Sequence, residues 1–395
     1  MKGSRILGGI LLVSGTTIGA GMLALPVVTG LAGFFPSLAI FAICWLVMLF
    51  TAFCLLDVTL SMKKEANLIS MSRQTLGPLG AGAAWLFYLL LLYSLLAAYI
   101  TGSAQILTSF SSHLFGVTPP AWLSPFLLPS LFGLFVYGGT RGVDRINRLL
   151  AFALFLSYAL LISLAPASIT PSLLMRVDGS AFLLAFPIII TSFGYHIIIP
   201  TLVTYVGRNR TACRRILLIG SLLPLLLYTL WQVVVLGIVP PADLFAALRA
   251  GAQAIAPLTR HLQSGLLTTI AGIFAFFAIV TSFLGVSLSL SDFLTDGFSL
   301  KRTHTGQLAA LALVFLPPLL FIFATNGGFI VALEYAAAFV ALLLILLPVG
   351  MAWRLSHPFY RSLRGRALLG AVALFALGIV AIDIAIHIGL LRYNA

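Results

Sequence analysis

The 395-residue sequence is poor in charge and in polar segments. Asp, Glu, Lys and Arg make up 8% of its positions, and only 9 residues are acidic, whereas 61% are hydrophobic. An average soluble domain carries about 25% charged residues. The longest polar connections, at about 60–79 and 240–263, are too short to hold a core of their own. The sequence therefore argues against a soluble enzyme and against an ATP-driven pump, which needs a nucleotide-binding domain.

Motifs of enzyme chemistry are missing as well. The chain contains no His-Glu-x-x-His zinc motif, no Gly-x-Ser-x-Gly elbow and no P-loop. Its three cysteines, Cys44, Cys54 and Cys213, lie in or near apolar stretches and form no extracellular disulfide framework. We expect no catalytic residue, no metal centre and no cofactor. A nucleic-acid partner is not expected either, because no basic run is long or interleaved with aromatic residues.

Long apolar runs are abundant. A helix that crosses about 30 Å of hydrocarbon needs about 20 residues, and most of these runs reach that length. The sequence therefore predicts an all-α, polytopic protein that spans the lipid bilayer. Eleven spans are expected at about 5–31, 34–59, 80–110, 124–140, 146–167, 181–206, 215–239, 264–291, 307–325, 327–350 and 367–391, of which the fourth is short and rich in Pro and Gly.

The basic residues predict the orientation. When loops are assigned to alternate sides, one side holds only Arg176, Arg249, Arg260 and Arg392 of the 22 Lys and Arg residues. Cytoplasmic loops of membrane proteins carry the excess of Lys and Arg. The N-terminus is therefore expected in the cytoplasm and the C-terminus in the periplasm, and the net charge of +13 indicates contact with an anionic inner leaflet.

Two of the spans are interrupted in the same way. The first reads Gly15-Thr-Thr-Ile-Gly-Ala-Gly-Met22 with Pro26 beyond it, and the sixth reads Thr191-Ser-Phe-Gly-Tyr-His196 with Pro200 beyond it. Gly lowers helix propensity and Pro removes a backbone donor. In hydrocarbon, freed backbone groups are tolerated only where they line a cavity or are buried in protein. Paired interruptions of this kind indicate the binding site of a secondary transporter.

The two interruptions also divide the chain. If they are equivalent, residues 1–168 (spans 1–5) and 181–353 (spans 6–10) are repeats, and span 11 at 367–391 is an addition. Five spans per repeat is an odd number, so the two halves insert with opposite orientation. This predicts a LeuT-type 5+5 inverted repeat with helices 1 and 6 broken, and no soluble domain.

The motifs resemble a known family. Gly15 to Pro26 looks like the first-helix signature of the hydroxy and aromatic amino acid permeases, in the amino acid–polyamine–organocation superfamily. Thr191 to His196 looks like the sixth-helix signature of that family, and Thr281-Ser-Phe-Leu-Gly-Val286 resembles its eighth-helix region. The similarity runs along essentially the whole chain. It implies a symporter in the bacterial inner membrane that is driven by protons.

An amino acid substrate suggests roles for the interrupted segments. A half-helix that starts near Gly21 offers N–H groups to the substrate carboxylate, while unwound carbonyls suit its ammonium group. The candidate substrate-binding residues are Thr17, Gly19, Ala20, Gly21, Thr191, Ser192 and Phe193, with Tyr195, Tyr99 and Phe283 as further parts of an aromatic wall. The alternative is that the small residues only allow close helix packing.

Two sets of residues are candidates for coupling transport to an ion. His196 is the only ionisable residue within either break, and it either exchanges a proton or holds the break open as a neutral ring. Thr281 and Ser282 form a possible sodium site, unless their hydroxyls bond back to their own helix. Asp57 is expected to pair with arginines of the inner loops, and Asp383 with His387 at i and i+4.

The sequence thus predicts a cation-coupled symporter of a free aromatic amino acid, with tyrosine favoured and H+ favoured over Na+. A sodium-coupled carrier and a serine or threonine permease remain as alternatives. A channel would need a symmetric polar pore or rings of charge, which the sequence does not show. It does not determine the oligomeric state.

Overall fold

The described part of the chain is entirely helical. We analysed a computed structural model that describes residues 2–63, 66–179, 182–262, 264–300, 303–325 and 328–391, and every regular element in those ranges is a helix. Lys64, Lys301, Arg302 and Arg392, which contribute to the predicted charge asymmetry, lie outside the described residues.

Most of the predicted spans are present as long apolar helices. In the described residues, nine helices are long and apolar enough to cross a membrane, and the bent pair near the N-terminus makes up to ten. The nine are α3 (Phe34–Ser61), α4 (Leu68–Phe115), α6 (Thr140–Leu164), the segment Leu183–Tyr205, α10 (Arg210–Ile238), α13 (Gly265–Gly297), α14 (His304–Thr325), the segment Phe329–Trp353 and α18 (Leu363–His387).

The fourth predicted span differs from the others. It forms α5 (Ser124–Tyr137), an apolar helix of 14 residues. At 1.5 Å per residue it is about 21 Å long, which is shorter than the hydrocarbon layer. In the described residues, up to ten of the eleven expected spans are therefore long enough to cross a membrane, and the fourth is short, as its Pro- and Gly-rich sequence indicated.

Shorter elements join or continue the spans. Phe329–Trp353 consists of α15 (Phe329–Val340), the π-helical η5 (Ala341–Leu346) and α16 (Leu347–Trp353). The connecting elements are η2 (Ala165–Ser168), α7 (Pro171–Leu174), η3 (Leu183–Ala185), α11 (Pro241–Arg249), α12 (Ile255–His261) and α17 (Pro358–Arg361).

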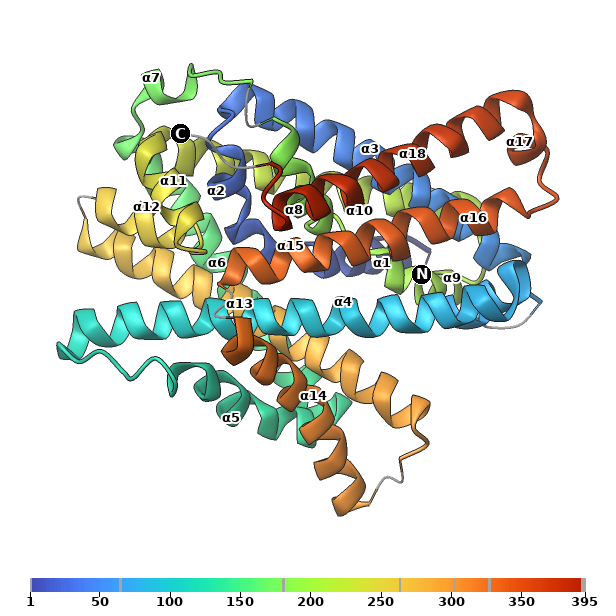
Figure 1. Ribbon diagram of the computed structural model, residues 1–395, viewed down its shortest axis with the longest axis horizontal. Coiled ribbons are helices and arrows are strands. Elements are labelled where there is room, and N and C mark those ends of the chain that lie inside the picture. The colour runs from blue at the N-terminus through green and yellow to red at the C-terminus, as the bar shows by residue number, and fades with distance from the viewer. Residues whose placement is uncertain are drawn as a thin grey trace.

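Helix α4 runs along the length of the molecule (Figure 1). It contains a bend at Gly77, whose φ of 80° lies in the left-handed region, followed by Pro78, which cannot donate a backbone hydrogen bond. In Figure 1, α5 and α14 lie on one side of α4 and α15, α16 and α18 on the other.

Both predicted interruptions are breaks in helices. The first span consists of α1 (Lys2–Thr17), the 3-10 turn η1 (Ala20–Leu23) and α2 (Leu25–Thr29), and its two parts are bent by 47°. The sixth consists of α8 (Phe186–Thr191), η4 (His196–Ile198) and α9 (Ile199–Tyr205). The first turns of α2, α8 and α9 contain Pro26, Pro187 and Pro200, at positions where a missing N–H group costs least.

A buried carboxylate ties three helices together at one end of the molecule. Asp57 of α3 pairs with Arg210 at 2.8 Å and Arg214 at 3.4 Å, both in the first turns of α10. The Tyr360 hydroxyl of α17 donates to the same carboxylate at 3.0 Å. Burial, with the neighbouring Cys54 and Asp57, raises the pKa of Tyr360, so this hydroxyl stays protonated and remains a donor. The expected pairing of Asp57 with arginines is confirmed. The expected pairing of Asp383 with His387 is also confirmed, at 3.8 Å.

Replacing Asp57 by Asn should destabilise the protein by about 1–3 kcal/mol, because Arg210 and Arg214 lose the carboxylate between them. The loss is not larger because both arginines are partly exposed to water. Asp144→Asn is the matched control, since the Asp144–Arg148 pair is exposed and should contribute less than about 1 kcal/mol. Thermal unfolding of both variants in detergent measures the difference. Equal shifts would contradict a structural role for the Asp57 cluster.

Candidate binding site at the two helix breaks

The two breaks face each other across one tyrosine side chain. The hydroxyl of Tyr228 on α10 lies 2.7 Å from the carbonyl oxygen of Thr17 and 2.9 Å from that of Ser192, so it can donate to either. Thr17 ends α1 and Ser192 follows α8. Both carbonyls lie where a helix unwinds, and they therefore meet at one buried hydroxyl.

Two neighbours of Tyr228 extend this contact along α10. The indole N–H of Trp231 donates to the Met22 carbonyl at 3.0 Å, and the Gln232 amide donates to Thr29 and Ser37. Positions 228, 231 and 232 have the i, i+3, i+4 spacing of one helix face. Sequence reasoning missed these residues, although three hydrogen-bonding side chains at helical spacing in an apolar span are a signal that could have found them.

The small residues of the first break are in close contact with polar side chains. The Ala20 N–H donates to Ser282 Oγ of α13 at 3.0 Å. A Cβ atom on Gly19 would overlap the same Ser282 Oγ, and one on Gly21 would lie 2.9 Å from Ser192 Oγ. A side chain at position 19 would displace the hydroxyl of α13, and one at position 21 would displace the hydroxyl of the second break, so both glycines lie where these elements come close to the first break.

Most of the predicted aromatic residues lie near the breaks. Phe193 is fully buried, and its ring packs edge-on against Tyr228 at 5.4 Å and Phe41 at 6.4 Å. Tyr195 is also fully buried, with its ring 5.2 Å from that of His196. Tyr99 of α4 is buried and lies beside Ser282.

Phe283 has a different environment. Its ring stacks on Phe315 of α14 at a centroid distance of 5.6 Å. Phe283 points about 100° away from Ser282 around the helix, and this ring contact is with α14.

The hydroxyls of Thr281 and Ser282, candidates for ion coupling, and of Thr191, a candidate for substrate binding, form hydrogen bonds within their own helices. Thr281 donates to the Phe277 carbonyl at 2.8 Å, Ser282 to the Ala278 carbonyl at 2.8 Å, and Thr191 to the Pro187 carbonyl at 3.2 Å. Each of these acceptors lies four residues back in the same helix. Ser282 faces an N–H group of the first break, whereas a cation site would need acceptor oxygens there.

His196 is buried beside α3. Its exposed fraction is 0%, and its Nε2 lies 2.8 Å from Thr51 Oγ1. Thr51 was not predicted from the sequence, since nothing in its own segment marks it. The contact fixes the ring at the start of η4, where the chain resumes a helical path after the break.

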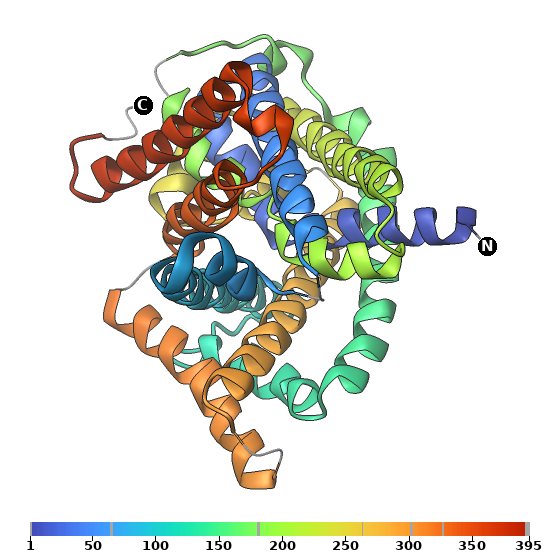
Figure 2. The same cartoon turned by 90° about the vertical axis from the view of Figure 1, so that its right-hand side faces the viewer.

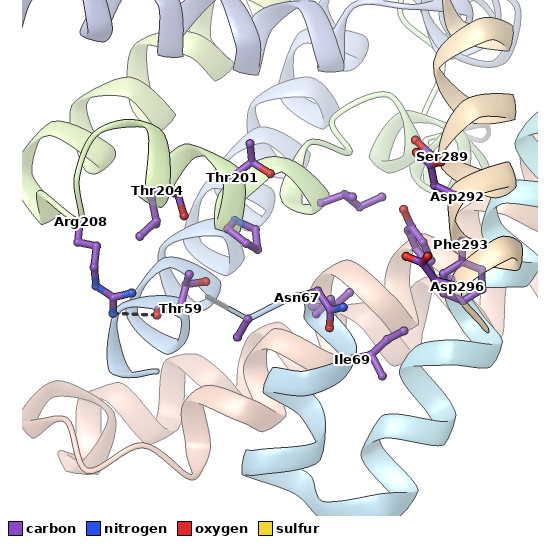
Figure 3. A pocket seen from close by; sticks show the side chains of 16 residues that line it. Thr59, Asn67, Ile69, Thr201, Thr204, Arg208, Ser289, Asp292, Phe293 and Asp296 are labelled. Atoms are coloured by element: carbon purple, nitrogen blue, oxygen red, sulfur yellow. Dashed lines mark hydrogen bonds between the residues drawn. The ribbon is translucent and has the colours of Figure 1, made fainter. Parts of the chain in front are cut away.

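A cavity of about 590 Å³ lies beside η4 and α9, which follow the second break (Figure 3). Ile197, next to His196, lies in its wall, and the C-terminal part of α13 contributes Ser289, Asp292 and Asp296. The rest of the wall consists of Thr59, Ala66, Asn67, Leu68, Ile69, Tyr88, Pro200, Thr201, Val203, Thr204, Arg208 and Phe293. Its volume is in the range that holds small molecules.

Arg208 forms part of the cavity wall and connects the turn after α9 to the end of α3. Its Nη2 donates to the carbonyls of Leu60 at 2.9 Å and Met62 at 2.8 Å, at the C-terminal end of α3. A cation is favourable there, because the last carbonyls of a helix carry a partial negative charge. Figure 3 shows a further hydrogen bond, from Arg208 to the Thr59 carbonyl at 3.5 Å, on the side of the cavity opposite to Asp292 and Asp296.

Comparison with known proteins identifies the family. Residues 2–386 match the tryptophan/tyrosine permease family. The chain is 31% identical to tyrosine-specific transport system 1 of Haemophilus influenzae, over 99% of both chains. It is 32% identical to a tryptophan-specific transport protein of Pseudomonas aeruginosa, over 94% of this chain and 92% of the relative, and 26% identical to the low affinity tryptophan permease of Escherichia coli. The chain therefore belongs to the tryptophan/tyrosine permease family and is a transporter rather than an enzyme.

Proposed function

We propose that this protein is a secondary active transporter that couples the symport of an aromatic amino acid to a cation by alternating access. Tyrosine is the favoured substrate, followed by tryptophan and phenylalanine. The observation that carries the proposal is the convergence of both breaks on Tyr228, which places backbone acceptors of two broken spans around one point. Relatives named for tyrosine and for tryptophan support the substrate class.

The breaks suit the common part of every amino acid. The carboxylate and the ammonium group lose water on binding, so each needs fixed partners in the protein. N–H groups of Gly19, Ala20 and Gly21 are proposed to hold the carboxylate, in the position where Ser282 Oγ now accepts from Ala20. Carbonyls of Thr17, Thr191 and Ser192 are proposed to hold the ammonium group, which would replace the Tyr228 hydroxyl as the partner of Thr17 and Ser192.

The aromatic neighbours suit the substrate side chain. Phe193, Tyr195 and Tyr99 are proposed to form the wall, since their rings are buried and lie beside the breaks. Phe283 is proposed as an outer part of the wall, because it adjoins Ser282 but stacks on α14. Edge-to-face ring contacts of about 0.5–1.5 kcal/mol would favour tyrosine over serine or threonine.

We also propose the LeuT-type inverted repeat, with residues 1–168 and 181–353 as its halves and the segment 367–391 outside it. In the orientation expected from the basic residues, the N-terminus is cytoplasmic, the C-terminus is periplasmic and the membrane is the bacterial inner membrane. The cavity beside α9 then opens to the cytoplasm, and it is the proposed release path from the second break.

Proton coupling is the favoured version of the proposal. His196 lies in the break and adjoins the cavity through Ile197, whereas Thr281 and Ser282 donate to their own helix. One charge that moves down 100 mV releases about 2.3 kcal/mol. This corresponds to about fifty-fold accumulation of substrate. Sodium coupling at Thr281 and Ser282 is the alternative.

Uptake of labelled tyrosine into proteoliposomes tests the proposal, with proton and sodium gradients imposed separately. We expect accumulation with the proton gradient and competition by unlabelled tryptophan and phenylalanine. Accumulation with sodium alone would establish the alternative coupling ion. Lack of accumulation with either gradient contradicts symport, and stronger competition by serine contradicts the aromatic assignment.

The role of His196 has its own test. His196→Gln should lower accumulation driven by a proton gradient at least about tenfold, because glutamine cannot exchange a proton, while tyrosine counterflow stays within about twofold. His261→Gln is the matched control, since His261 pairs with Asp243 outside the breaks. An equal loss of counterflow and of accumulation would mean that His196 only positions the break.

A further inference from the structure

A basic turn joins the last two long helices at the end of the molecule where Asp57 lies. We call residues 353–366 the basic elbow. It runs from the end of α16 at Trp353 through α17 to the first turn of α18, and Figure 2 shows α17 projecting toward the viewer there. The elbow contains Arg354, Arg361, Arg364 and Arg366, all exposed, and no acidic residue occurs between Glu334 and Asp383.

The four arginines have no acidic partner in the described part of the chain. None of them forms an ion pair with a described carboxylate, and the nearby Asp57 is shared by Arg210 and Arg214. Arg361 donates to the Ser356 hydroxyl at 2.7 Å, and the Arg366 guanidinium lies 5.8 Å from the centre of the Trp353 ring. The Ser356 hydroxyl and the Trp353 ring are uncharged, so they orient the guanidinium groups without cancelling their charge.

The elbow is a fixed structure. Ser362 Oγ accepts from the Gly365 N–H at 3.1 Å and caps α18. A Cβ atom on Gly365 would overlap the Phe359 carbonyl oxygen, so the chain turns back on itself there with no room for a side chain. Tyr360 is buried and bonds to Asp57, which anchors the turn to α3. The start of α18, a 25-residue helix, adds its positive dipole end to the same surface.

Large apolar side chains lie among the arginines. Leu363 is 86% exposed, Trp353 46% and Phe359 44%. Trp and Phe beside Arg, at the junction between apolar spans, is the pattern of a segment that lies at the boundary between lipid headgroups and hydrocarbon. A basic surface immediately next to a membrane span attracts acidic lipid headgroups.

From this combination we infer that the basic elbow is a binding site for the phosphate headgroup of an anionic phospholipid. The arginines, with their planar donors, hold the phosphate, while Leu363, Trp353 and Phe359 contact the upper part of the acyl chains. The site lies outside the helix breaks, and the inference does not depend on the transported substrate. Bound lipid would also steady the Tyr360–Asp57–Arg210 contacts at this end of the molecule.

Lipid binding to the purified full-length chain tests the inference. Native mass spectrometry would compare phosphatidylglycerol with phosphatidylcholine of the same acyl chains, and inorganic phosphate would be added as a competitor. The variant R354Q/R361Q/R364Q/R366Q removes the elbow charges. The matched control R73Q/R145Q/R148Q/R215Q removes four exposed arginines elsewhere. The double variant R364Q/R366Q leaves the Arg361–Ser356 contact in place if the quadruple variant does not fold.

We expect the wild type to prefer phosphatidylglycerol at least about tenfold, and the quadruple variant to lose most of that preference, since each basic residue near an anionic surface contributes to binding. The double variant should lose part of it and the control variant almost none. An equal loss in the control would overturn the inference, because binding would then reflect only net charge. Full competition by millimolar phosphate would also overturn it, since the site would then hold a free anion rather than a lipid.

Discussion

Gly21→Leu should lower tyrosine uptake at least about 100-fold, while the protein still inserts and folds. A Cβ atom there would already lie 2.9 Å from Ser192 Oγ, so the three further carbons of leucine would be forced between the two breaks. Overpacking of this kind costs about 1–3 kcal/mol and moves the surrounding backbone. In the proposed site the same backbone binds the carboxylate. Uptake by proteoliposomes, with equal amounts of monodisperse protein, measures the effect.

Gly15→Leu is the matched control for this variant. Gly15 belongs to the same sequence motif, but it is exposed in α1 and a Cβ atom there meets nothing within 4 Å. A leucine on this surface should leave uptake within about twofold of the wild type. If Gly21→Leu also retained uptake within about twofold, the proposed carboxylate site would be wrong. If Gly15→Leu lost uptake as fully as Gly21→Leu, the loss would reflect helix α1 in general.

Removal of one hydroxyl from α10 should have the second largest effect. In Tyr228→Phe the carbonyls of Thr17 and Ser192 lose their shared donor, which lies at 2.7 and 2.9 Å. A buried acceptor without a partner costs about 1–3 kcal/mol. Because the two carbonyls belong to different breaks, we expect the breaks to lose their mutual alignment and uptake to fall at least about tenfold. Thermal unfolding and uptake would be measured on the same preparation.

Tyr158→Phe separates this effect from the general loss of a buried hydrogen bond. The Tyr158 hydroxyl donates to the Leu227 carbonyl at 2.7 Å, a contact between α6 and α10 that does not include a break. This variant should be destabilised to a similar extent but should keep most of its uptake. Equal losses of uptake in both variants would show that Tyr228 acts through stability alone.

Features that depend on short stretches of chain were predictable. The breaks at 15–22 and 191–196 were expected because Gly and Pro weaken a helix through their own backbone, whatever lies around them. The long apolar helices followed from hydropathy, which indicates whether a segment lies in lipid or in water. The pairing of Asp57 with arginines was expected for a similar reason, since a carboxylate near basic loops at a membrane boundary needs a counter-charge.

Features that depend on how helices are rotated against each other were not predictable. Tyr228 and Thr17 are 211 residues apart, and His196 and Thr51 are 145 apart. Among 30 phenylalanines, composition could not distinguish Phe193, which packs on Tyr228, from Phe283, which stacks on α14. A rotation of one residue, about 100°, moves a side chain from the helix breaks to another helix.

The sequence alone therefore determined that this protein is a helical membrane transporter, where its two special helices unwind, and to which family it is similar. Those properties follow from local backbone preference, from hydropathy and from short motifs. The tertiary structure decided which groups the unwound backbone meets, namely Tyr228, Ser282 and Thr51, and how the elbow at 353–366 presents its arginines. The physical reason is that buried polar groups must find partners, and only the packing of distant helices determines which partners lie within reach.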